Sequence, residues 1–128
     1  MSAEVTFPET IDTERLKLRR YTAAHAERIL DLVDRNRSDL LRNFSSMAKD
    51  LCTVREAQSF IVQKDQEWDA GKSCCYGIWL KSSQHLLGQL LVKNIVWDVP
   101  SAELSYFIKG SSQRQGFATE AIDRKSVV

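Results

Sequence analysis

The strongest constraint on the fold is a change to a hydrophobic period of two between Ser73 and Ile108. Three runs rich in apolar residues are separated there by short polar turns, and they are Ser73–Leu80, His85–Trp97 and Ala102–Ile108. A period of two is typical of β-strands, and turns this short join antiparallel neighbours. The sequence therefore predicts a three-stranded antiparallel meander. Gly88, inside the middle run, predicts either a β-bulge or a close approach of two backbones.

A helix with clear start and stop signals precedes the meander. Thr53-Val-Arg-Glu56 is a capping box, in which the two end side chains satisfy N–H groups that the helix leaves free. Gly71 supplies the left-handed residue that commonly follows a helix. The sequence predicts a helix from this box to about Ala70, with a stripe that consists of Ala57, Phe60, Ile61, Lys64 and Trp68.

Weaker patterns before residue 53 predict one strand and two helices. Leucines alternate with basic residues over Glu14–Tyr21, which indicates a strand with one solvated face. That basic face either attracts an acidic substrate or protects a sheet edge. The other predictions are an extended lead-in over residues 1–12, a helix from its N-cap Thr22 to about Asn36, a short helix Asp39–Phe44 capped by Ser38, and a loop Ser45–Asp50.

The totals favour one soluble domain, predicted to span residues 1–128. A hydrophobic content of 43% suffices for a core, and a net charge of +1 gives no reason to expect nucleic acid or an anionic membrane as partner. No apolar run approaches the roughly 20 residues of a membrane-spanning helix. The N-terminus lacks a basic segment followed by an apolar one. We therefore expect a cytoplasmic protein.

The three cysteines, Cys52, Cys74 and Cys75, show no metal-ligand spacing. Neighbouring residues of a strand point to opposite faces, so the adjacent pair is not placed for one shared site. We expect reduced cysteines and no metal, with Cys74 and Cys75 buried as small apolar side chains. A nucleophilic role for Cys74 or Cys75 is the alternative. His85, near the tip of the first hairpin, is interpreted as a solvated turn residue.

The stretch Ser111–Ala121 follows the last predicted strand and leads into the start of a helix. A strand, a short glycine-containing loop and a helix start together can hold a phosphate group, because the first N–H groups of a helix lack carbonyl partners. Gly116 lets the backbone come close to a ligand, and Arg114 adds a positive charge at the rim. The sequence therefore predicts a phosphate-binding loop.

With this order of elements, Gln113-Arg-Gln-Gly-Phe-Ala118 resembles the signature Gln/Arg-x-x-Gly-x-Gly/Ala of the GNAT superfamily of acyl-CoA-dependent N-acyltransferases. The whole chain from about residue 10 to 122 is similar to the RimJ/RimL-like branch, which acetylates ribosomal-protein N-termini. The segments that carry this likeness are Thr13-Glu-Arg-Leu-Lys-Leu-Arg19, Tyr76-Gly-Ile-Trp79, Leu87-Gly-Gln-Leu90, Ala102-Glu-Leu-Ser-Tyr-Phe107 and Gly116-Phe-Ala-Thr-Glu-Ala121.

The resemblance implies an α/β (α+β) fold, with a mainly antiparallel sheet and helices packed on it. It implies transfer of an acetyl group from acetyl-CoA to a primary amine, of a protein N-terminus or a small molecule, by direct attack in a ternary complex. The family binds the pyrophosphate on the loop that matches Gln113, Arg114, Gln115, Gly116, Phe117 and Ala118, with Thr119 nearby. The pantetheine arm runs along the strand that matches Tyr106, Phe107 and Ile108. Glu103 matches the glutamate that some members use as general base.

Structural roles stay open for the same residues. On simple alternation Glu103, Ser105 and Phe107 share one face of their strand, although a bulge would change that parity. Glu103 could instead pair with a basic neighbour. Gly116 could serve only the turn, and Arg114 could contact only water.

Members of the family continue after the loop helix with a strand, a helix and two further strands, whereas only Asp-Arg-Lys-Ser-Val-Val follows Ile122 here. We therefore expect the N-terminal part of a GNAT fold without its C-terminal half, and a sheet edge at Ala102–Ile108 that is open to homodimerisation. Three hypotheses follow: an active acetyltransferase completed by a partner chain, a truncated product without catalysis, and a binding module that uses the same surface.

Overall fold

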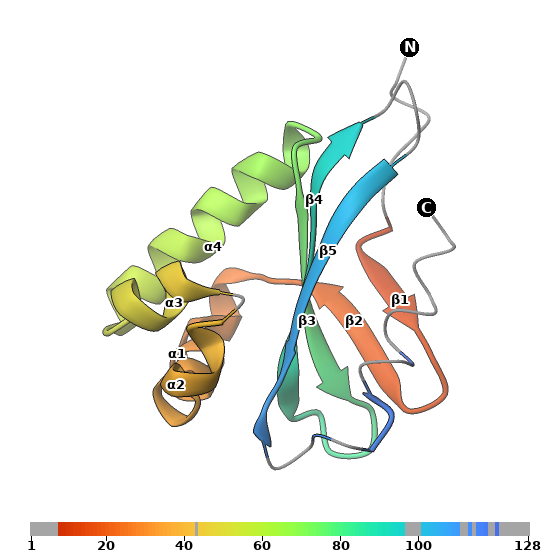
Figure 1. Cartoon of the computed structure of the whole chain (residues 1–128), viewed down its shortest axis with the longest axis horizontal. Coiled ribbons are helices and arrows are strands. Elements are labelled where there is room, and N and C mark those ends of the chain that lie inside the picture. The colour runs from red at the N-terminus through yellow and green to blue at the C-terminus, as the bar shows by residue number, and fades with distance from the viewer. Residues whose placement is uncertain are drawn as a thin grey trace.

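Within the described residues, five antiparallel strands form one sheet in chain order, and the helices lie on one side of it (Figure 1). The structure is a computed structural model that describes residues 8–42, 44–96, 101–110, 113, 115–117 and 120. The strands are β1 (Thr10–Asp12), β2 (Leu16–Arg20), β3 (Cys74–Leu80), β4 (Leu86–Val96) and β5 (Ser101–Ile108). The helical segments are η2 (Ala23–His25), α1 (Ala26–Arg35), α2 (Arg37–Leu40), α3 (Ser45–Asp50) and α4 (Val54–Asp69).

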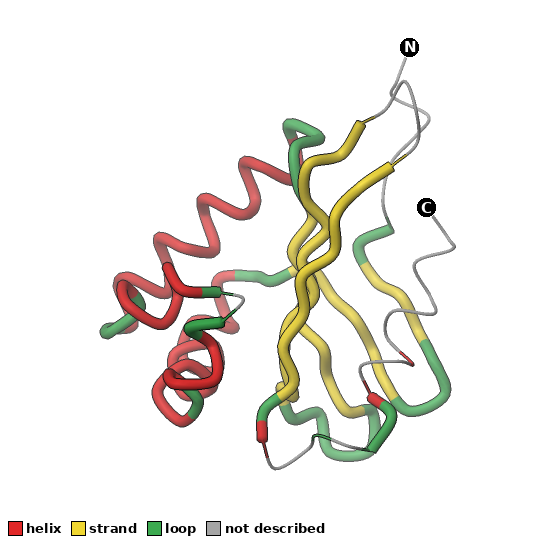
Figure 2. The backbone as a smooth tube through the Cα atoms, viewed as in Figure 1, coloured by secondary structure: helices red, strands yellow, loops and turns green. Residues whose placement is uncertain are grey.

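The predicted meander is confirmed, since β3, β4 and β5 pair as consecutive antiparallel neighbours. Figure 2 shows these strands side by side, with the helices grouped beside them. β2 adds to the free side of β3, with Leu18 opposite Ile78. The mainly antiparallel α/β architecture expected from the sequence is therefore present. The turn predicted after Trp97 lies outside the described residues.

The N-terminal strand is shorter than the predicted Glu14–Tyr21, because a hairpin precedes it. β1, which the sequence suggested was only an extended lead-in, pairs with β2 and sets Ile11 opposite Leu18. Thr13 closes the turn: its N–H donates to the Leu16 carbonyl at 2.9 Å, and the Leu16 N–H donates to the Thr13 hydroxyl at 3.0 Å. A hydroxyl that binds the local backbone in this way favours a turn over a continuous strand. Leu16 and Leu18 are buried, as the alternation predicts.

The capped helix is confirmed as α4. The Glu56 N–H donates to the Thr53 hydroxyl at 3.2 Å, and the Glu56 carboxylate accepts from the Cys52 N–H at 3.0 Å. Gly71 follows the helix with a φ of +74°, in the left-handed region. The start and the end of this helix were therefore both encoded locally.

The segment before α4 was predicted wrongly. Ser45–Asp50, expected to be a loop, is α3, and the expected helix Asp39–Phe44 is instead α2, which starts after Asn36. Tertiary contacts decide this segment. The Arg37 guanidinium donates to the carbonyls of Ala48 and Leu51 at 2.7 and 2.6 Å, which satisfies acceptors at the end of α3.

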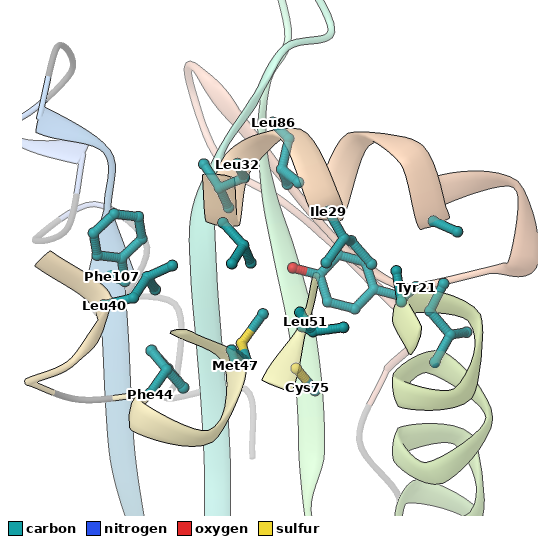
Figure 3. Close-up of a cluster of buried hydrophobic side chains, with 14 of the residues drawn as sticks. Tyr21, Ile29, Leu32, Leu40, Phe44, Met47, Leu51, Cys75, Leu86 and Phe107 are labelled. Carbon is teal, nitrogen blue, oxygen red and sulfur yellow. The ribbon is translucent and has the colours of Figure 1, made fainter. Parts of the chain in front are cut away.

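Two apolar cores lie on the two faces of the sheet. The helix-face core, shown in Figure 3, packs α1 to α4 against the sheet and includes Tyr21, Ile29, Leu32, Val33, Leu40, Phe44, Met47, Leu51, Ala57, Ile61, Cys75, Trp79 and Phe107. The loop-face core includes Ile11, Leu16, Leu18, Cys74, Tyr76, Ile78, Leu87, Leu90, Val92, Ile108 and Phe117. Each face of the sheet therefore buries apolar side chains.

The adjacent cysteines behave as predicted. Cys74 belongs to the loop-face core and Cys75 to the helix-face core, so their side chains point to opposite faces. All three cysteines are free thiols. Burial raises the pKa of Cys74 and of Cys75 to about 12. These thiols stay protonated at neutral pH, so a nucleophilic role is not supported.

Gly88 allows β4 and β5 to approach each other closely. A Cβ added to Gly88 would lie 1.8 Å from the Phe107 carbonyl oxygen, closer than any real contact. The pairing with β3 also shifts at this point, because Ile78 lies opposite Gly88 whereas Trp79 lies opposite Leu86. Both predicted features, the close approach and the bulge, are present.

Candidate functional site

The candidate loop begins with a tight turn after β5. The Lys109 N–H donates to the Leu87 carbonyl at 2.8 Å, so hydrogen bonding to β4 extends one residue beyond the strand. The Gln113 N–H donates to the Gly110 carbonyl at 3.3 Å. The Gln113 side-chain amide donates to the Ile108 carbonyl at 2.8 Å. Gln113, the first residue of the signature, therefore closes the turn.

Gly116 marks the point at which the loop becomes helical. Its φ is +81°, in the region that favours glycine. The Glu120 N–H donates to the Gly116 carbonyl at 3.0 Å, which is the spacing of an α-helical turn. The side chain of Phe117 is buried in the loop-face core. Because the first N–H groups of a helix have no carbonyl partner within it, the turn after Gly116 suits an anionic ligand.

Arg15, from the turn between β1 and β2, holds this loop in place. Its Nε lies 2.7 Å from Glu120 Oε1, and its Nη1 donates to the Gln115 carbonyl at 2.9 Å. The centre of the guanidinium lies 4.4 Å from the centroid of the Phe117 ring, the geometry of a cation–π contact. One side chain thus contacts three residues of the loop.

Glu120 receives further donors from the same turn. Its Oε2 accepts from the Arg15 backbone N–H at 2.8 Å and from the Thr13 hydroxyl. Burial by itself raises the pKa of Glu120, but the hydrogen bonds from Thr13 and Arg15 outweigh it, so the net pKa is below the ordinary value. We call the contacts of Thr13 and Arg15 with Gln115, Phe117 and Glu120 the Arg15 clamp.

The sequence did not reveal the Arg15 clamp. Arg15 was assigned to the solvated face of a strand, and Glu120 was given no role. The two residues are 105 positions apart, and no local pattern pairs residues at that separation. Both lie in segments that resemble the RimJ/RimL-like proteins, which is the one signal that could have drawn attention to them.

The three β5 residues expected to border the pantetheine arm lie in different surroundings. Phe107 is buried in the helix-face core and Ile108 in the loop-face core. Tyr106 has a relative exposure of 41%. Within the described residues, β4 is the strand that pairs with β5. Tyr106 can therefore meet a ligand with its side chain, whereas the other two offer backbone groups.

Glu103 lies near the start of β5 and is exposed. The ladder pairs it with Lys93, and pairs Ser105 with Leu91 and Phe107 with Gln89. This register keeps simple alternation from residue 103 to 107, so Glu103 is on the helix face, as expected without a bulge. Lys93 lies directly opposite Glu103, which also fits the alternative that Glu103 pairs with a basic neighbour.

A hollow of about 480 Å³ opens on the helix face between α3, α4 and β4. Leu91 lines it, and the cross-strand partner of Leu91 is Ser105 in β5. Its walls combine aromatic and acidic side chains, namely Phe44, Phe60, Asp50 and Glu56. The hollow is thus on the face of the sheet that carries Glu103.

Three predicted site residues, Arg114, Ala118 and Thr119, lie outside the described residues. Among the side chains that the structure does describe, no group of three or more His, Cys, Asp or Glu residues is placed to hold a metal ion. In the same part of the chain, no helix has the length and apolar character needed to cross a membrane.

The fold and the loop can now be compared with known proteins. The family model described as "Acetyltransferase (GNAT) domain" matches residues 15–125. The chain belongs to this family. The match begins at Arg15 and includes Glu120, so both ends of the Arg15 clamp lie inside the GNAT domain. No protein with a curated function matches the sequence significantly.

Solved structures show the same GNAT fold. One is the proposed ribosomal-protein-serine acetyltransferase of Vibrio cholerae, 26% identical with a TM-score of 0.79 over 96% of this chain and 67% of that one. The RimL ribosomal-protein acetyltransferase in complex with coenzyme A is 19% identical, with a TM-score of 0.82 over 93% and 66%. The microcin C7 self-immunity acetyltransferase MccE in complex with acetyl-CoA and AMP is 18% identical, with a TM-score of 0.82 over 93% and 65%. The chain spans about two thirds of the length of these proteins.

Proposed function

We propose that this chain forms the acetyl-CoA-binding part of an N-acetyltransferase that acetylates a primary amine, at a protein N-terminus or on a small molecule. The observation that carries the proposal is the helical turn that begins after Gly116, at the end of β5, in a chain that matches the GNAT family over residues 15–125. A turn of this kind offers backbone N–H groups to an anion such as a pyrophosphate.

The described part of the loop fits a pyrophosphate group. Gly116 presents backbone without a side chain, and a Cβ placed there would lie 3.4 Å from Arg15 Nη2. The carboxylate of Glu120 is paired with Arg15 at 2.7 Å, which reduces its repulsion of a bound anion. The loop is therefore open to a ligand and has a compensated charge.

β5, the strand beside the loop, is the element along which we place the pantetheine arm of acetyl-CoA. Acetyl-CoA, when bound, supplies an acetyl group that is activated as a thioester. The backbone of β5 at Tyr106, Phe107 and Ile108 borders the expected path of the pantetheine arm. Because Phe107 and Ile108 are each anchored in a core, β5 is held rigidly, as a positioning strand must be.

We assign the role of general base to Glu103. An amine attacks only through a free lone pair, so it must first lose a proton. The support is positional: Glu103 shares the helix face with Ser105, whose partner Leu91 lines the hollow. Replacing Glu103 by glutamine should lower kcat by about 10²- to 10⁴-fold and leave the Kd for coenzyme A unchanged. Full turnover by this variant would instead favour a structural pair with Lys93.

The hollow between α3 and α4 is the proposed entrance for the acceptor. Asp50 and Glu56 outnumber the one cation of the lining, Lys64, and the resulting negative charge attracts a protonated amine. The similar structures named as ribosomal-protein acetyltransferases support a peptide N-terminus as acceptor. The homodimer expected through the edge of β5 stays a prediction.

Calorimetric titration with coenzyme A tests the proposal. The wild-type chain should bind, and Gly116→Asp should abolish binding because it puts bulk and negative charge beside the phosphates. Gly71→Asp is the matched control: Gly71 also has a positive φ, +74°, but it lies after α4 and should leave binding intact. A folded wild-type chain that gives no heat would contradict the proposal. In a parallel assay with acetyl-CoA, binding without release of the free thiol of coenzyme A when an amine is added would favour the binding module.

A further inference from the structure

We propose that Arg15 is a positioning residue for coenzyme A: through the Arg15 clamp it fixes the loop that binds the pyrophosphate. This inference rests on the proposed function, because it assigns a role toward the same ligand. It concerns a residue in the first hairpin of the chain, which no motif for cosubstrate binding had marked.

The contacts of Arg15 with the loop come from three different parts of its guanidinium. Nε faces Glu120, Nη1 donates to the Gln115 carbonyl, and Cζ lies over the Phe117 ring. Nη2 lies 3.4 Å from the position that a Cβ of Gly116 would take. The side chain therefore touches the loop immediately before and after its glycine.

Glu120 completes the fixation from inside the helical turn. Its carboxylate accepts from the Arg15 side chain, the Arg15 backbone and the Thr13 hydroxyl, and its N–H donates to the Gly116 carbonyl. Glu120 thus links the first helical turn to the β1–β2 turn. A rotation of the helix start relative to the sheet would break several of these bonds at once.

Holding the loop in one position should strengthen its binding of a pyrophosphate, because backbone N–H groups make the contacts. Hydrogen bonds weaken steeply when their angle departs from linear, so N–H groups bind phosphate well only when their directions are fixed. An arginine can fix them because its planar fork reaches a carboxylate, a carbonyl and an aromatic face together. A lysine carries the same charge but has a single ammonium, and it cannot make all three contacts.

The test compares Arg15→Met and Arg15→Lys with wild type by calorimetric titration of coenzyme A. Since hydrogen bonds to charged groups are at stake, Arg15→Met should weaken binding by about 10- to 100-fold. Arg15→Lys should recover little of this loss. Arg19→Met is the matched control, because Arg19 is exposed on β2 and makes no contact in the Arg15 clamp; its affinity should equal that of wild type.

A second ligand separates positioning from a general structural role. Acetyl-pantetheine lacks the pyrophosphate, so kcat/KM with this donor should be the same in Arg15→Met and wild type, whereas kcat/KM with acetyl-CoA should fall. Hydrogen exchange in the free protein gives a readout without ligand. The Glu120 amide, bonded to the Gly116 carbonyl, should lose protection in Arg15→Met and keep it in Arg19→Met.

The outcomes are distinguishable. Wild-type affinity in Arg15→Met, or full recovery in Arg15→Lys, would overturn the positioning role while leaving the proposed function in place. Equal losses with acetyl-CoA and acetyl-pantetheine would show a structural role and also overturn it. If the wild-type chain binds no coenzyme A, the proposed function fails, and this inference with it.

Discussion

The helices on one face of the sheet and the loop on the other are held by different kinds of contact. The helix face is covered by α1 to α4, which come from one continuous stretch of chain and bury an apolar core (Figure 3). On the loop face, the described loop residues 115–117 and 120 are held by one buried ring, Phe117, and by the polar Arg15 clamp from the other end of the chain. Fold stability and ligand binding should therefore be separable: the helix face should govern the free energy of unfolding, and the Arg15 clamp the affinity for coenzyme A.

The largest effect should come from a change that damages both faces together. Gly88→Val would place side-chain atoms against the Phe107 carbonyl, where even a Cβ lies at 1.8 Å, and so force β4 and β5 apart. We expect a loss of about 4 kcal/mol or more in the free energy of unfolding. Urea denaturation measures it.

Gly110→Ala is the control for Gly88→Val. A Cβ at Gly110 would meet Asp39 at 3.8 Å, an ordinary contact, so stability should change by less than about 0.5 kcal/mol. A Gly88→Val variant with stability close to wild type would show that β4 and β5 can separate without cost. The close pairing of β4 and β5 at Gly88 would then not be a support common to both faces.

A smaller effect should be confined to the helix face. The buried Tyr21 hydroxyl donates to Gln89 Oε1 at 2.9 Å. Tyr21→Phe leaves that acceptor unsatisfied and should cost about 1–3 kcal/mol, with an unchanged Kd for coenzyme A. The matched change on the loop face is Tyr76→Phe, which loses a bond to the carbonyl of the exposed Pro8 and should cost less. A drop in affinity for coenzyme A in Tyr21→Phe would show that the two faces are coupled.

The next effect concerns the start of α4. Thr53→Ala removes the hydroxyl that accepts from the Glu56 N–H and should cost about 1 kcal/mol in thermal or urea unfolding. Thr53→Ser keeps the acceptor and should match wild type. Equal losses in both variants would mean that the threonine methyl group, and not the cap, stabilises the helix. Binding of coenzyme A should not respond to either change.

The smallest effects are those of pH. The helix face and the Arg15 clamp should each lose stability in a different range of pH. Burial, with the charges of Arg19 and Arg28, lowers the pKa of His25 from 6.5, and its Nδ1 accepts from the Thr22 N–H at 3.0 Å. A folded state that binds a proton more weakly than the unfolded chain is fully stabilised above the unfolded pKa, and it loses that stability as pH falls through the folded pKa. The same sign holds for Glu120, whose pKa is lowered from 4.5.

Urea unfolding as a function of pH tests this separation. Stability should begin to fall below about pH 6.5, and His25→Gln should flatten that slope, while His85→Gln, at an exposed turn, should not. Protection of the Glu120 amide against exchange should hold to about pH 4.5 and fall below it. Loss of that protection already near pH 6 would show that the Arg15 clamp depends on a group other than Glu120.

Local signals were sufficient for part of this protein. The capping box at Thr53 and the glycine at Gly71 fix the two ends of α4 through contacts within one helical turn. Gly88 predicted a close approach of two strands, because a side chain at this position would collide with the neighbouring backbone. The cap is predictable because its hydrogen-bonding partners lie within a few residues of each other. The glycines are predictable because few structural situations require a glycine.

Local signals failed where a distant partner decides the conformation. α3 was predicted as a loop because its own pattern is weak; Met47 and Ala48 are buried by the rest of the helix face, and Arg37 binds the end of the helix. The hairpin of β1 and β2 was missed because one hydroxyl, that of Thr13, determines the turn. Tertiary packing routinely overrides weak propensity of this kind.

The sequence by itself determined the meander, the capped helix and the position of the loop at Gln113 to Gly116, because period, caps and glycine act over a few residues. The tertiary structure alone decided what holds that loop. Arg15 and Glu120 meet at 2.7 Å although 105 positions separate them, and only the folded sheet brings them together. A charge pair has no sequence period, so its partners become visible only when the fold has placed them.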